Sequence, residues 1–132
     1  MPKSGTYFVF NKDIIGKIEK IAEDRVKDAG DIQLEETKKS LTGPRSGKIG
    51  NLPGGGKYRM SSPGETPAER SGELKKSIRM RLNRSQAFIG TDLDYGLALE
   101  YGTSKIKPRP FMRISHERAK GRIKKRIGSK WF

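Results

Sequence analysis

An apolar pattern with helical period, running from about residue 13 to residue 40, is the strongest constraint on how this chain can fold. Its members recur every three or four residues, at Ile14, Ile18, Ile21, Arg25, Ala29 and Ile32. Asn11 or Asp13 can cap the start of the predicted helix. Gly30 weakens its interior by up to about 1 kcal/mol relative to alanine. At 1.5 Å per residue such a helix is about 40 Å long, and any fold of the chain must accommodate it.

A segment rich in glycine and proline follows the predicted helix. Gly43 and Pro44 end the helix, and residues 43–72 hold eight glycines and four prolines with no apolar period. A loop of this length inside a compact domain is usually functional or disordered. We expect an arm or hairpin that becomes ordered on a neighbouring molecule, with plain disorder as the alternative.

Short elements fill much of the remaining chain. Alternation of basic and apolar residues predicts a half-buried hairpin strand with Met80 and Leu82 facing inward. The expected short elements are a strand at Thr6–Phe10, a helix at Gly72–Ile78, hairpin strands at Arg79–Arg84 and Gln86–Thr91, a helix at Tyr95–Tyr101 and an extended stretch at Lys105–Pro110.

The boundaries of the later helices are marked by residues that cap helix ends. Ser71 can cap the first short helix, and Asp92 or Asp94 the second, which Gly102 ends. A last helix runs from Phe111 to about Ile127. Its thin apolar stripe consists of Met112, His116, Ala119, Ile123 and Ile127. The chain is therefore predicted to be one α+β domain, residues 1–132. A small, mostly antiparallel sheet is packed by a long N-terminal helix and a basic C-terminal helix.

Positive charge is concentrated in the last part of the chain. The chain has 29 Lys and Arg against 15 Asp and Glu, a net charge of +14, yet residues 1–42 are balanced at eight against eight. Residues 105–132 hold eleven bases and one acid, Glu117. This excess predicts an anionic partner, and a solvated face without a partner is the alternative. The residues expected to face the anion are Arg113, Arg118, Lys120, Arg122, Lys124, Lys125 and Arg126.

The composition argues against an enzyme, a metal protein or a membrane protein. The chain has no cysteine and one histidine, His116, which removes thiol chemistry and most metal cages. The stretch Gly50–Tyr58 lacks the spacing of a phosphate-binding loop, and Asp92 with Asp94 suits a helix cap better than a cation site. We expect no catalytic residue, no metal and no cofactor. No run approaches a membrane span, and no signal peptide opens the chain, so a soluble protein made in the cytosol is expected.

Five short motifs in order resemble one protein family. Two lie within Gly64–Ile78: Gly64 to Pro67, and Ser71-Gly72 with Leu74 and Ile78. The other three are Ile89-Gly90-Thr91, Tyr95 to Thr103, and Arg109-Pro110-Phe111. Together they resemble the tail-completion proteins of long-tailed phages, also called head–tail joining or neck proteins. The similarity covers about residues 43–115. Gly96, Tyr101 and Ile114-Ser115 depart from the usual pattern.

The resemblance implies a structural protein of the virion neck, made in the host cytoplasm. It implies a ring of six copies. The ring would join the connector or stopper protein of the DNA-filled head to the tail terminator or tail tube protein. Genome DNA passing through the lumen would make non-specific contact with the ring. Glu100 would pair with a base such as Lys105 or Arg109. The alternative function, suggested by the basic C-terminal helix, is a stand-alone nucleic-acid-binding protein. The candidate subunit or fold contacts are Leu74, Ile78, Tyr95, Glu100, Tyr101, Gly102, Arg109, Phe111, Trp131 and Phe132.

Overall fold

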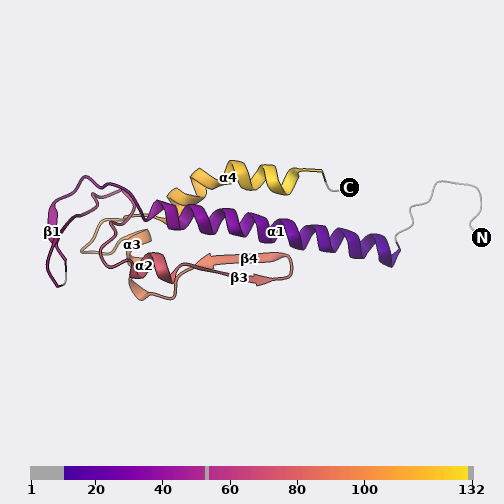
Figure 1. Cartoon of the computed structure of the whole chain (residues 1–132), viewed down its shortest axis with the longest axis horizontal. Coiled ribbons are helices and arrows are strands. Elements are labelled where there is room, and N and C mark those ends of the chain that lie inside the picture. The colour runs from indigo at the N-terminus through magenta and orange to yellow at the C-terminus, as the bar shows by residue number, and fades with distance from the viewer. Residues whose placement is uncertain (1–10, 53, 131–132) are drawn as a thin grey trace, which may run out of the picture.

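The computed structural model describes residues 11–52 and 54–130, and these form an α+β fold (Figure 1). The strand predicted at Thr6–Phe10 lies outside the described residues. Instead of the one sheet that we expected, the described chain has two separate antiparallel pairs, β1 with β2 and β3 with β4. The elements are α1 (Lys12–Ser40), β1 (Ile49–Asn51), β2 (Lys57–Arg59), α2 (Glu73–Ser77), β3 (Arg79–Asn83), β4 (Gln86–Gly90), α3 (Asp94–Tyr101) and α4 (Met112–Gly128).

The long predicted helix is confirmed as α1, and Asn11 is its cap. The Asn11 side-chain oxygen accepts a hydrogen bond of 2.9 Å from the Ile14 N–H. Figure 1 shows α4 along one side of α1 and the β3–β4 hairpin along the other. Both partners contact only its later part, since the buried residues of α1 begin at Arg25. The predicted stripe is therefore wrong in its first half: every residue from 11 to 20 is exposed.

The β3–β4 hairpin approaches α1 closely at Gly30. A Cβ at Gly30 would lie 2.4 Å from the Met80 sulfur and 3.0 Å from the Ala87 Cβ. The glycine that we took as a weak point of the helix thus makes room for the hairpin. Its lower helix propensity is offset by this close packing.

The β3–β4 hairpin matches its predicted bounds within one residue at each strand. Its antiparallel register pairs Met80 with Ile89 and Leu82 with Ala87, so these four side chains share one face. Met80 is half-buried against α1, as predicted. Leu82 is 47% exposed, which contradicts the expected inward position. The face is covered where it meets α1, and Leu82 lies one step nearer the turn of the hairpin.

A small apolar core holds the elements together near the C-terminal end of α1. Leu41, Leu74, Ile78 and Phe111 form it, with exposures between 1% and 8%. These residues come from the end of α1, from α2 and its C-cap, and from the residue that precedes α4. Half-buried residues packed around them are Leu34, Ile89, Leu93, Leu99 and Met112. The core therefore fixes where α3 and α4 begin.

Two of the three expected helix caps differ from prediction. Gly72, in a left-handed conformation, is the N-cap of α2, while the Ser71 hydroxyl accepts from the Glu73 N–H at 3.3 Å. Neither Asp92 nor Asp94 caps α3. Its N-cap is Leu93, and Asp92 pairs instead with Arg79, 2.6 Å away on β3. Gly102 ends α3 as predicted, and its N–H donates to the Ala98 carbonyl.

The glycine- and proline-rich segment contains the β1–β2 hairpin, and Arg45 ties its base to the fold. The Arg45 guanidinium donates to the carbonyl oxygens of Ser40 at 2.9 Å, Thr66 at 2.8 Å and Pro67 at 3.0 Å. Burial lowers the Arg45 pKa. The structure thus shows a short hairpin within the predicted segment, while an arm over residues 43–72 that orders on a neighbouring molecule stays a prediction.

Glu65 makes the base of this segment sensitive to acid. Its carboxylate accepts from the Ser46 hydroxyl and from the N–H groups of Ser62 and Ser46, which lowers the Glu65 pKa. A lowered pKa gives stability that is present above the unfolded value of 4.5 and lost as pH falls through the folded value. We expect the protection factors of the Ser46 and Ser62 amides, their exchange rates relative to an unstructured chain at the same pH, to fall below that range. In Glu65→Gln these protection factors should no longer depend on pH there, and an unchanged dependence would contradict this role.

Candidate interaction surfaces

Glu100 joins α3 to the start of α4. Its carboxylate accepts hydrogen bonds from the backbone N–H groups of Phe111 at 2.8 Å, Met112 at 2.9 Å and Arg113 at 3.0 Å. These are donors that the first turn of a helix leaves without an intrahelical partner, and a carboxylate there also suits the helix dipole. The predicted pairing of Glu100 with Lys105 or Arg109 is wrong. Glu100 caps the basic helix instead.

Arg109 connects the turn after α3 to two other segments. Its N–H donates to the Leu99 carbonyl at 2.6 Å, and its side chain donates to the carbonyl oxygens of Ser61 at 3.3 Å and Lys107 at 3.4 Å. We expected this side chain to be a candidate partner of Glu100. It bonds backbone carbonyls instead, which fixes the path of the chain into Phe111.

The contact between α1 and α4 is mostly polar. Ser115 and Ala119 are the buried residues of α4, with no exposed surface. The Ser115 hydroxyl lies 3.1 Å from the Thr37 hydroxyl, and both accept from the Gln33 amide at 3.0 Å. His116, predicted on the apolar stripe, is exposed, with its Nδ1 3.2 Å from the Gln33 Oε1. The predicted stripe is therefore displaced by one residue at this point.

Ion pairs divide the predicted anion-facing residues into two sets. Arg122 pairs with the buried Glu36 of α1 at 2.6 Å, and Arg126 pairs with Asp28 at 2.5 Å. Lys120 pairs with Glu117 on its own helix. The second set consists of Arg113, Arg118, Lys124 and Lys125, which are exposed and have no ion pair within residues 11–52 and 54–130. We call these four residues the outer basic face.

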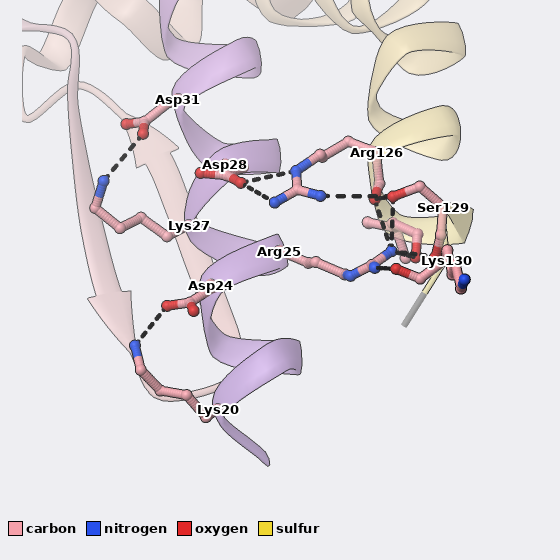
Figure 2. A network of polar contacts seen from close by, with 10 residues as sticks. Lys20, Asp24, Arg25, Lys27, Asp28, Asp31, Arg126, Ser129 and Lys130 are labelled. Carbon is pink, nitrogen blue, oxygen red and sulfur yellow. Dashed lines mark hydrogen bonds and ion pairs between the residues drawn. The ribbon is translucent and has the colours of Figure 1, made fainter. Parts of the chain in front are cut away.

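Arg25 closes the C-terminal end of α4. Its guanidinium donates to the carbonyl oxygens of Arg126 at 3.1 Å, Ile127 at 3.0 Å and Ser129 at 2.5 Å, and also to that of Lys130 (Figure 2). These carbonyls lie at or just beyond the last turn, where α4 supplies no N–H of its own. A cation there also complements the helix dipole. With Glu100 at the other end, both ends of α4 are held by side chains from elsewhere in the chain.

We expect Arg25→Met to lower the free energy of unfolding by about 2 kcal/mol and to speed amide exchange in the last turn of α4. Arg25 is only 5% exposed, and its loss leaves several part-buried carbonyls without a charged donor. Lys27→Met is the matched control, since Lys27 pairs with Asp31 at 3.2 Å on the exposed side of α1. That change should cost less than about 1 kcal/mol. Equal losses for the two variants, measured by urea unfolding, would contradict the capping role.

The structure separates the predicted subunit or fold contacts by exposure. Leu74, Ile78 and Phe111 are core residues, and Gly102 and Glu100 shape the turn and the cap. Tyr101 is 74% exposed and Tyr95 42% exposed, and burial together with the Glu73 carboxylate raises the pKa of Tyr95. Trp131 and Phe132 lie outside the described residues. Leu97, 69% exposed beside Tyr101, was missed because a leucine in a helix is expected to be buried.

Comparison of the chain with protein-family models, with curated proteins and with solved structures finds no match. Within the described residues, no group of three or more histidine, cysteine, aspartate or glutamate side chains is placed to hold a metal ion. No described helix is long and apolar enough to cross a membrane. The outer basic face and the exposed apolar residues are candidate surfaces of the described chain.

Proposed function

We propose that this chain is a structural protein of the phage neck. In this proposal six copies form a ring between the head connector or stopper protein and the tail terminator or tail tube protein. The chain acts by binding and assembly and catalyses no reaction. The proposal rests on the resemblance described above and on the way in which the residues that carry it are used.

The supporting observation is the contact between two of the resembling motifs. Glu100 belongs to the motif Tyr95–Thr103, and Phe111 ends the motif Arg109–Phe111. The Glu100 carboxylate accepts from the N–H of Phe111 and from the next two N–H groups. The two motifs therefore form one structural unit, which sets the direction of the basic helix relative to the core.

The charge distribution gives this helix a role in the assembled particle. Asp28 and Glu36 neutralise bases on the side of α4 that faces α1, while the outer basic face stays exposed. Repulsion between copies in a ring would require a negative partner at this face. Genome DNA in the lumen and an acidic surface of a neighbouring neck protein both meet that need.

A phage lacking the gene for this chain tests the proposal. We expect filled heads and completed tails to accumulate separately, and the purified chain to join them when it is added to the lysate. Firmly joined particles in the absence of the chain would refute the neck function.

Charge variants test the outer basic face within the same assay. The fourfold change Arg113→Gln, Arg118→Gln, Lys124→Gln and Lys125→Gln should abolish joining. The control replaces the exposed Lys39, Lys48, Lys57 and Lys107 by glutamine, which removes the same charge elsewhere, and should leave joining intact. If the two variants joined equally well, the outer basic face would have no special role.

The outer basic face also favours a second function, stand-alone binding of duplex nucleic acid. If its four bases each neutralise a phosphate, the fourfold variant should reduce the salt slope of duplex binding by roughly 3.6. Tight, salt-steep binding by the purified chain, together with normal head–tail joining in its absence, would favour this function over the first. Loose binding with failed joining would favour the neck protein.

A further inference from the structure

Two exposed apolar patches lie near opposite ends of α1 (Figure 1). The isoleucine patch consists of Ile14, Ile15 and Ile18 on the first turns of α1, which are 40%, 43% and 37% exposed. The α3 patch consists of Leu97 and Tyr101, four residues apart on one face of α3 and 69% and 74% exposed. Figure 1 shows α3 near the C-terminal end of α1, so the long helix separates the two patches. Exposed apolar groups that lie together mark interaction sites.

The isoleucine patch lies on a part of α1 that no described element covers. The thirteen residues from Lys12 to Asp24 precede the first buried residue, Arg25, and extend over about 20 Å of helix. Figure 1 shows this part of α1 projecting beyond both α4 and the β3–β4 hairpin. Every residue from 12 to 20 is exposed, so within the described chain the isoleucine patch has no covering element, whereas Ile21 and Ala22 further along are half-buried.

Opposite charges lie beside the two patches. Lys17 borders one side of the isoleucine patch and has no ion pair among the described residues, while Lys12 and Glu19 lie on the other side. Asp94 lies three residues before Leu97, is exposed, and starts a helix whose eight residues contain no base. Docking of one patch on the other therefore buries apolar surface with a lysine facing an aspartate at its edge.

We propose that the isoleucine patch of one copy docks on the α3 patch of the next copy. The two patches differ and lie near opposite ends of α1, so their contact is head-to-tail rather than two-fold. Head-to-tail contacts build closed rings when the rotation between copies closes. This assignment extends the proposed neck ring by naming the surfaces through which its copies meet, and it rests on the proposed function only for the place of that ring in a virion.

Engineered cysteines test the contact directly, because the natural chain has none. Ile18→Cys and Leu97→Cys are made as separate full-length variants, then mixed at high concentration and oxidised. We expect a covalent dimer in the mixture and none in either variant alone. A mixture of Ile18→Cys with Arg84→Cys, at the exposed turn of the β3–β4 hairpin, is the control and should stay monomeric. Cross-linking of Ile18→Cys with itself would indicate a two-fold contact between α1 helices and overturn the proposal.

Charge insertion and light scattering give an independent test. Ile18→Lys should reduce the oligomer to monomer and should keep the thermal midpoint that the natural chain has at concentrations where it is also monomeric. Ile49→Lys, at an isoleucine 53% exposed on β1, should leave the oligomer intact. A lower thermal midpoint for Ile18→Lys at unchanged mass would show that the chain's own remaining residues cover the patch. That result, or a natural chain that is monomeric at every concentration, overturns the proposal.

The two proposals fail in different ways. If the mixture does not cross-link while the chain still joins heads to tails, the contact is wrong and the neck function stands. If the mixture cross-links while particles join without the chain, the contact stands and the neck function is wrong.

Discussion

Replacing Phe111 with alanine is expected to lower the free energy of unfolding by about 3–5 kcal/mol. Phe111 is 1% exposed and is one of the largest fully buried side chains in the described structure. It packs with Leu41, Leu74 and Ile78 in the small core. Because these come from the end of α1 and from α2 with its C-cap, removing the ring leaves a cavity where the elements meet. A domain of this size has about 5–15 kcal/mol of stability in total, so the variant will be close to unfolding.

Urea unfolding followed by circular dichroism measures this effect. Phe88→Ala is the matched control, because Phe88 is 56% exposed on the outward face of the β3–β4 hairpin. It should cost less than about 1 kcal/mol. A similar loss for Phe88→Ala, or a loss below about 1 kcal/mol for Phe111→Ala, would show that the core is not where the structure places it.

Local sequence patterns were sufficient to predict most of the elements. The apolar period predicted α1, the alternation of Arg79–Arg84 predicted β3, and the Gly102 signal predicted the end of α3. These signals depend on residues close together in sequence. Each predicts one helix or strand, whatever other element packs against it. The prediction of an α+β fold followed from them.

The same patterns failed where the burial of a residue depends on which other element packs against it. Ile14 and Ile18 have the period of a buried stripe, yet α4 and the β3–β4 hairpin reach only the later part of α1. Conversely, Arg25 occupies a stripe position, and its charge is used to bond the end of α4, about 100 residues away in sequence. Contacts at such separations leave no periodic signal, so the sequence alone could not assign them.

The sequence identified many residues of the candidate surfaces but not the contacts that these residues make. The excess of bases on α4 is plain from the sequence, but the division between the outer basic face and the paired Arg122 and Arg126 depends on where Glu36 and Asp28 lie. Glu100 was chosen for a role near the turn. Its action as the cap of α4 depends on an approach that only the folded chain reveals.

The second large effect is expected at Gly102, where alanine should cost about 3 kcal/mol or more. Gly102 has φ 75° and ψ 175°, a backbone conformation that is essentially restricted to glycine. A Cβ there would also lie 2.8 Å from the Ile106 carbonyl oxygen and 2.9 Å from the Pro108 nitrogen. Both are backbone atoms, so relief requires moving the turn that leads into Arg109 and Phe111. The strain is therefore transmitted to the core and to the start of α4.

Gly64→Ala, outside the Gly102 turn, is the control that separates the effect of backbone strain from the effect of crowding. Gly64 also has a positive φ, 87°, but a Cβ there would meet no atom within 4 Å. Gly64→Ala should lower the free energy of unfolding by about 1–2 kcal/mol, the cost of a left-handed backbone at alanine. We expect Gly102→Ala to lose clearly more in urea unfolding and to speed amide exchange at Phe111 and Met112, whose N–H groups Glu100 holds. Equal losses for the two variants, with unchanged exchange at these amides, would mean that the turn yields without disturbing the basic helix.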